Sequence, residues 1–273
     1  METTNGGKSP QPTDTTNKVL VNVILDRSGS MQPIRDATIS GYNEYLNSLR
    51  ADKNSEYNIS LIQFDSEHDG PSLTIKYADK PLGEVADLTP ADYEPRGMTP
   101  LYDAIGECIR RVETKGRLVI TAIITDGMEN ASHEFTIDNI KALIAEKEKE
   151  HWTFVFLGTG IDSYAVSASM GMPAHATSNY AGDPQHVQAT YSAFAQSTVS
   201  RSAMARHVGL RAASASRMFT NSQRTAMGGA RPGTTAGGRP AAPPQFRPPS
   251  PTSQAKPLAR KRTNWKESRV PQP

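Results

Sequence analysis

The chain of 273 residues can hold one large domain or two small ones, and its formal net charge is only +2. That average conceals an asymmetry, because residues 201–273 contain 14 lysines and arginines against one acid, whereas the first 200 residues contain 16 against 27. The single cysteine excludes an intramolecular disulfide. No apolar run of about 18 residues predicts a transmembrane helix, and the polar N-terminus does not resemble a secretory signal, so we expect a cytoplasmic protein.

Composition divides the chain into three parts. Residues 1–17 are polar, and from about residue 220 the chain consists mainly of Pro, Gly, Ala, Ser, Gln and Arg. Such stretches bury too little apolar surface to offset the entropy lost on ordering them. We therefore expect a disordered N-terminal arm at 1–17, an ordered domain with a C-terminal helical extension at 18–219, and a disordered, basic, Pro/Gly-rich tail at 220–273.

Within residues 18–219, apolar strands alternate with amphipathic helices. The pattern predicts, in chain order, a strand at 19–25, a helix at 34–50, strands at 57–64 and 73–77, a helix at 101–114, a strand at 118–124, a helix at 137–150, a strand at 153–157, a short helix at 162–170, a weak edge strand at 174–177, and a long helix from 184 to about 206 or 218. This alternation indicates an α/β fold with a doubly wound, mostly parallel central sheet flanked by helices.

The last predicted helix carries a mostly apolar stripe. Its members are Val187, Tyr191, Phe194, Thr198 and Ala205. Because they recur at helical spacing, we expect this long C-terminal helix to pack on the sheet or on a neighbouring helix.

Three separated segments offer hard oxygen ligands. Asp26, Ser28 and Ser30 directly follow the apolar run 19–25, Thr99 lies in a loop rich in Pro and Gly, and Asp126 follows the apolar run 118–124. In open parallel sheets, ligands bind at the carboxyl ends of the strands, which is where these segments are expected. Two carboxylates and three hydroxyls suit a Mg²⁺-like ion. A purely structural alternative is that the hydroxyls cap the next helix and the carboxylates bind loop amides.

With these segments the chain resembles the von Willebrand factor A (vWA) domain, over about residues 18–160. The metal-ion-dependent adhesion site (MIDAS) of that family uses a D-x-S-x-S loop, a distant Thr and a distant Asp. Asp26, Ser28, Ser30, Thr99 and Asp126 occupy all five positions, so the resemblance implies an intact MIDAS. It also implies that the three hydroxyls bind Mg²⁺ (or Mn²⁺) directly, that the two aspartates act through water, and that a partner's carboxylate completes the coordination.

The expected function is therefore a non-catalytic, metal-binding module that captures an Asp or Glu of a partner protein; its partner-binding residues are unknown. One alternative is a metal-dependent phosphohydrolase, although no general base or nucleophile is evident beside the site. A second is a nucleic-acid-associated scaffold, or a protein with an acidic partner, acting through the basic tail, where residues 260–262 and Trp265 form the densest cationic and aromatic cluster.

Other reactive groups have simpler explanations. Cys108 lies on the apolar face of a predicted helix and is expected in the core. None of the six histidines forms a close metal-binding pair. Asp65, Glu67 and Asp69 are interpreted as a solvated acidic turn, with a second cation site as the alternative. The Gly-Thr-Gly sequence at 158–160 is interpreted as a plain strand-to-helix turn.

Overall fold

The computed structural model of the chain describes residues 15–66, 73–114 and 116–229. The chain divides into two units, residues 1–236 and 237–273, and every described residue belongs to the first. The expected disorder of residues 1–14 and 230–273 concerns residues outside the described part of the chain.

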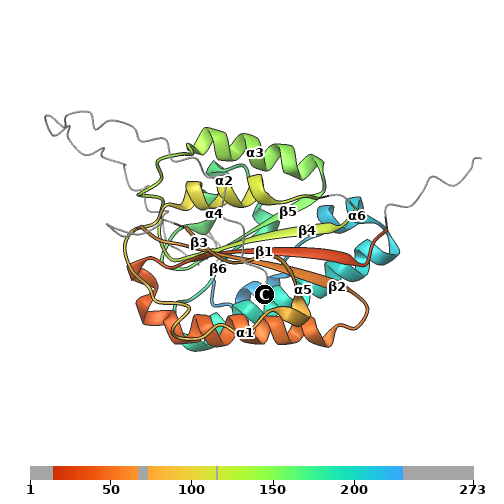
Figure 1. Ribbon diagram of the computed structural model, residues 1–273, viewed down its shortest axis with the longest axis horizontal. Coiled ribbons are helices and arrows are strands. Elements are labelled where there is room, and N and C mark those ends of the chain that lie inside the picture. Colours follow the sequence, from red (N-terminus) through yellow and green to blue (C-terminus); the bar gives the residue numbers. More distant parts are fainter. Residues whose placement is uncertain (1–14, 67–72, 115, 230–273) are drawn as a thin grey trace, which may run out of the picture. The chain divides into compact units, whose positions relative to one another are not determined.

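A six-stranded sheet with the order β3-β2-β1-β4-β5-β6 forms the centre of the described structure (Figure 1). Only β3 is antiparallel to its neighbour, and the other pairs are parallel. The strands are β1 (Lys18–Asp26), β2 (Glu56–Phe64), β3 (Leu73–Pro81), β4 (Leu118–Thr125), β5 (Trp152–Gly158) and β6 (Thr177–Asn179). The mostly parallel, doubly wound α/β fold expected from the sequence is confirmed.

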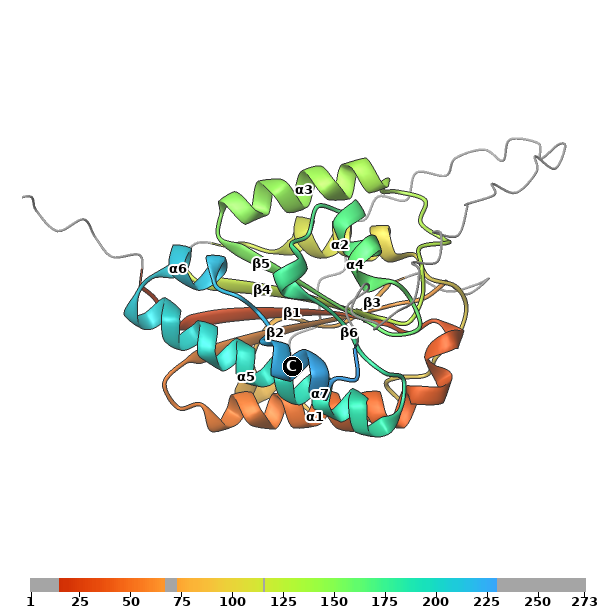
Figure 2. The ribbon, with the colours of Figure 1, turned by 180° about the vertical axis from the view of Figure 1, so that it is seen from behind.

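Helices connect the strands and cover both faces of the sheet. They are α1 (Arg35–Ala51), α2 (Leu101–Arg111), α3 (Ile137–Lys149), α4 (Ser163–Ser169), α5 (Pro184–His207), α6 (Leu210–Ala215) and α7 (Asn221–Ala226), with short 3-10 helices η1 (Gly29–Ile34), η2 (Leu82–Glu84) and η3 (Ala174–Ala176). Seen from both sides, α2, α3 and α4 lie over one face, and α1 and α5 lie over the other (Figures 1 and 2).

Strand β1 is buried on both faces, and its side chains alternate between two cores. Val21 and Val23 belong to the core beneath α1 and α5, whereas Leu20 and Ile24 belong to the core beneath α2 and α3. This two-sided burial explains why the sequence of β1 is almost continuously apolar. Because β1 and β4 are adjacent and parallel, the loops that follow them meet at the carboxyl end of the strands.

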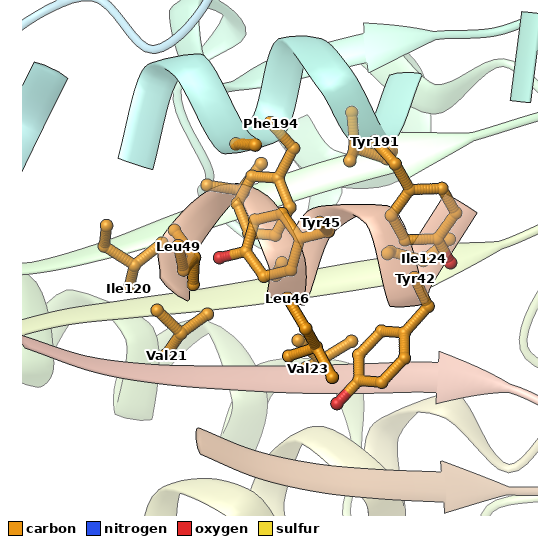
Figure 3. Packing of buried hydrophobic residues seen from close by; sticks show 14 of the residues in the cluster. Val21, Val23, Tyr42, Tyr45, Leu46, Leu49, Ile120, Ile124, Tyr191 and Phe194 are labelled. Carbon is orange, nitrogen blue, oxygen red and sulfur yellow. The ribbon is translucent and has the colours of Figure 1, made fainter. Parts of the chain in front are cut away.

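Helix α5 packs against α1, as the apolar stripe predicted. The rings of Phe194 and Tyr45 lie against each other (Figure 3). They stack with centroids 4.5 Å apart and planes 3° apart. The hydroxyl oxygens of Tyr45 and Thr198 lie 3.3 Å apart. The helix ends at His207, near the first of the two expected ends (206 or 218), because Gly209 adopts a φ of 106°, which ends the helical path.

The weak edge strand expected at 174–177 lies slightly later in the chain. Its first residues form η3, and β6 pairs in parallel with β5 from Thr177 onward, opposite Phe156. Pro173 directly precedes η3. A strand of three residues is too short for an alternation of apolar and polar residues to fix its bounds from sequence.

Ordered structure continues past the domain boundary expected at 219. Thr220 caps α7 through a reciprocal capping box. The guanidinium of Arg224, only 6% exposed, donates to the carbonyl oxygen of Thr177. Met227 is fully buried. The segment therefore packs through one arginine and one methionine, which explains why composition alone placed it in the tail.

The expected N-terminal arm also ends earlier than residue 17. The amide of Thr16 donates to the carbonyl of Ala205, and the amide of Glu56 donates to the carbonyl of Asn17. These contacts tie residues 16 and 17 to α5 and β2.

Candidate metal centre

The candidate centre lies where the strand order reverses. From β1 the chain proceeds through β2 to β3 on one side, then returns to β4, β5 and β6 on the other. The carboxyl ends of β1 and β4 therefore flank a switch point, the usual place for a ligand in an open parallel sheet. Asp26 is the last residue of β1, and Asp126 directly follows β4.

Asp26 is fully buried and held from two directions. One carboxylate oxygen accepts the amide of Ser28 at 2.7 Å, and the other accepts the hydroxyl of Thr125 at 2.5 Å. Burial raises the pKa of Asp26 from 3.8 to about 6, with a smaller upward contribution from the charge of Asp126, while these hydrogen bonds partly oppose the rise. The fold thus places a carboxylate where its negative charge is poorly solvated.

A chain of hydrogen bonds joins the first loop to Asp126. The hydroxyl oxygens of Ser28 and Ser30 lie 3.1 Å apart, and Ser30 donates to the Oδ1 of Asp126 at 2.7 Å. Burial raises the pKa of Asp126, and the hydrogen bond from Ser30 partly opposes that shift. Ser30 is exposed, whereas Ser28 is 2% exposed, so this chain of oxygens runs from the interior to the surface.

Thr99 reaches the same space from the loop before α2. Two hydrogen bonds fix its backbone. The amide of Thr99 donates to the Oδ1 of Asn130 at 2.8 Å, and the amide of Asn130 donates to the carbonyl of Thr99 at 3.1 Å. A Cβ at Gly127 would lie 2.9 Å from the Oγ1 of Thr99 and 3.6 Å from the Oδ2 of Asp26. Oxygens of Thr99 and Asp26 therefore border one small space that only a glycine at position 127 leaves open.

The structure thus brings together all five residues singled out from the sequence. Asp26, Ser28, Ser30 and Asp126 are joined by hydrogen bonds, directly or through a neighbour, and Thr99 faces Asp26 across Gly127. Among the described residues there is no group of three or more His, Cys, Asp or Glu that could hold a metal. A cation here would therefore depend on hydroxyl oxygens as much as on carboxylates.

Sequence reasoning missed a second layer beneath the loops. Asp65 is fully buried, and its Oδ2 accepts the Nε of Arg27 at 2.5 Å and the Nε of Arg96 at 3.3 Å. The amide of Arg96 donates to the carbonyl of Arg27 at 2.7 Å, and the amide of Gly29 donates to the carbonyl of Gly97 at 3.2 Å. Asp65 therefore links the first loop to the loop that carries Thr99.

This pairing corrects the interpretation of Asp65 as part of a solvated acidic turn. Asp65 directly follows β2, whose last residue, Phe64, pairs with Asp26 in the sheet register. The carboxylate of Asp65 therefore lies beneath the loop that follows β1, where it pairs with Arg27. Glu67 and Asp69, the other members of that turn, lie outside the described residues.

The remaining groups take no part in the centre. Cys108 is buried in the core, as expected, and burial raises the pKa of its thiol to about 12.

A surface cavity of about 610 Å³ lies at the start of β5, bordered by Trp152, His175 and Arg211 among others. Because β5 begins at the opposite end of the sheet from the centre, cavity and centre are separate. None of the described helices is both long and apolar enough to span a bilayer.

Comparison with known proteins supports the fold. No protein-family model matches the chain, and no curated protein matches it significantly. Two crystal structures of the pilus adhesin SpaC from Lactobacillus rhamnosus GG match with TM-scores of 0.54 and, in the open conformation, 0.52. Both are 13% identical and match 67% of this chain, but only 31% and 30% of the adhesin. The chain thus spans about a third of the adhesin's length.

A von Willebrand factor type A protein from Catenulispora acidiphila gives a more distant match, with a TM-score of 0.43, 13% identity, and coverage of 67% of this chain and 43% of that chain. Likeness at such identities concerns the fold alone. Strand order, parallel pairing and the helices on both faces are those of the Rossmann-like vWA fold, in agreement with the resemblance noted in the sequence.

Proposed function

We propose that this protein binds a divalent cation, Mg²⁺ or Mn²⁺, at Asp26, Ser28, Ser30, Thr99 and Asp126. The observation that carries the proposal is that hydrogen bonds link Asp26, Ser28, Ser30 and Asp126, while oxygens of Asp26 and Thr99 border one space beside Gly127. As in the family that the chain resembles, the hydroxyls of Ser28, Ser30 and Thr99 would bind the ion directly. The two aspartates would hold waters and balance its charge.

The chemistry of the donors fits a hard cation. All five donors are oxygens, which Mg²⁺ and Mn²⁺ prefer over nitrogen or sulfur. Two carboxylates in a partly buried site offset the charge of a divalent ion. Burial raises the pKa of Asp26, so the negative charge of this carboxylate is poorly stabilised by the protein alone. A bound cation supplies electrostatic attraction for an anionic ligand.

The partner we propose is a protein that presents an Asp or Glu. Because the direct ligands would be three neutral hydroxyls and the two aspartates would act through water, an incoming carboxylate that reaches the ion itself gains strong attraction. A non-catalytic role is favoured because the described hydrogen bonds of Asp26, Ser30 and Asp126 involve hydroxyl and backbone groups, and no imidazole or thiol that would serve as a base or nucleophile. A binding role also agrees with the adhesin whose fold the chain shares.

Calorimetric titration of the full chain with Mg²⁺ and Mn²⁺ tests the metal centre. We expect saturable binding to the wild type and none to Ser30→Ala, which removes an exposed donor without opening a core. Glu146→Ala, which removes an exposed carboxylate on α3, is the matched control and should bind like the wild type. Binding that persists unchanged in Ser30→Ala and Asp126→Ala would refute the assignment.

A further inference from the structure

Large apolar side chains are exposed at three positions in the described part of the chain. They are Met98 at 53%, Met128 at 57% and Val208 at 66%. Met98 directly precedes Thr99, and Met128 is the second residue after Asp126. Two of the three therefore lie on loops of the candidate metal centre, and we refer to Met98 and Met128 as the methionine rim.

The two loops of the methionine rim are fixed to each other. Reciprocal hydrogen bonds join Thr99 and Asn130, at 2.8 Å and 3.1 Å, and each rim methionine lies within two residues of this pair. Met31, in the 3-10 helix after the first loop, is fully buried in the core, as a methionine that stabilises the fold would be. The rim methionines belong to neither core cluster, and exposed apolar side chains on two joined loops are typical of a binding surface.

Charged side chains on these loops are already engaged. Arg27 and Arg96 pair with Asp65 beneath the loops. The carboxylate of Glu129 accepts backbone amides, including those of Tyr102 and Ser132. The arginines described on these loops thus already have a carboxylate partner, so a bound cation is the source of attraction that we infer for a partner's carboxylate, and the loops around it offer apolar contact.

We propose that the methionine rim binds apolar side chains next to the acidic residue that the metal captures. The partner segment is then an Asp or Glu flanked by aliphatic or aromatic residues, rather than an acidic run. This inference rests on the proposed function. Methionine suits the task because its unbranched, polarisable side chain adapts to different apolar shapes.

Selection from a displayed peptide library tests this inference. The library has a fixed central Asp and randomised flanking positions, is bound to the immobilised full chain in Mg²⁺, and is eluted with EDTA. The wild type should enrich aliphatic and aromatic residues next to the Asp. The double variant Met98→Gln/Met128→Gln should lose that enrichment, and Val208→Gln, the third exposed apolar position, should retain it.

Affinity measurements on the best selected peptide complete the test. Burial of one methionine is worth about tenfold in affinity, so each single Met→Gln change should weaken the peptide by about that factor while Mg²⁺ alone binds as in the wild type. EDTA-eluted peptides without flanking preference, or with the same preference in the double variant, would overturn this inference alone. A complete absence of EDTA-eluted peptides would overturn the capture of an acid by the metal as well.

Discussion

At the scale of single residues, Asp26 represents a conflict between stability and binding. Its pKa of about 6 means that the folded protein holds the proton more tightly than the unfolded chain, where the value is near 3.8. Between these two pH values only the folded state is protonated, so the contribution of this group to stability falls as pH rises. At neutral pH the ionised carboxylate destabilises the metal-free protein.

Asp26→Asn should therefore stabilise the metal-free protein at pH 7 while abolishing Mg²⁺ binding. The expected gain is about 1–3 kcal/mol, since a shift of about two pKa units corresponds to about 3 kcal/mol. Thr125 can accommodate the change because its hydroxyl also contacts the carbonyl of Gly127. Urea unfolding in EDTA measures the gain, which should shrink as pH falls from 6 to 4; a variant less stable than the wild type at pH 7 would contradict this account.

Asp65 is linked to the loops of the metal centre through Arg27 and Arg96. Asp65→Asn removes the charge that holds the two guanidinium groups under the loops, so we expect Mg²⁺ affinity to fall by about tenfold, in line with other changes behind metal ligands. The variant should remain folded by circular dichroism. Asp138→Asn, on the first turn of α3, is the control. Unchanged Mg²⁺ affinity in a folded Asp65→Asn protein would show that the pairing is irrelevant to the site.

The five residues of the centre were predictable, but their support was not. Asp26 and Asp126 each follow a strongly apolar run, so sequence alone places them at the ends of buried strands. The pairing of Asp65 with Arg27 joins residues 38 positions apart and depends on the register of β2 against β1. The sequence pattern does not specify which residues of two strands pair. Asp65 was therefore interpreted as one of several acids in a turn.

At the scale of elements, periodicity predicted those that bury a continuous apolar stripe. Helix α5 was recognisable because Val187, Tyr191 and Phe194 all enter one core. Helix α7 was not, because it is six residues long and is anchored by Arg224 through backbone carbonyl groups. Hydrogen bonds from a buried arginine to carbonyls have no compositional signature.

Truncation can determine how much α7 contributes. A chain ending at residue 229 keeps Arg224 and Met227, whereas one ending at 219 loses both. Loss of a fully buried methionine costs about 2–5 kcal/mol, so the shorter chain should melt markedly lower than the chain ending at 229. Differential scanning calorimetry of the pair measures this difference. Equal melting temperatures would mean that α7 adds nothing to the fold.

At the scale of the whole molecule, the metal centre should report through global stability. The five proposed ligands lie between residues 26 and 126 and come from loops that join different strands, so a cation that bridges them binds the folded state and not the unfolded chain. At a Mg²⁺ concentration of about 100 times Kd, mass action adds about 2.7 kcal/mol. For a domain of this size, that corresponds to a rise in melting temperature of several degrees.

We expect this rise in the full chain and to the same extent in the chain ending at 229, because no proposed ligand lies beyond Asp126. EDTA should reverse it, and Ser30→Ala should abolish it. The rise should also diminish below about pH 6, since a cation competes with the proton that Asp26 then retains. Thermal melts of the full chain, the shorter chain and Ser30→Ala across Mg²⁺ concentration and pH, with and without EDTA, measure these effects. An equal rise in Ser30→Ala would place the stabilising cation elsewhere, and a rise that persisted undiminished at pH 5 would separate it from Asp26.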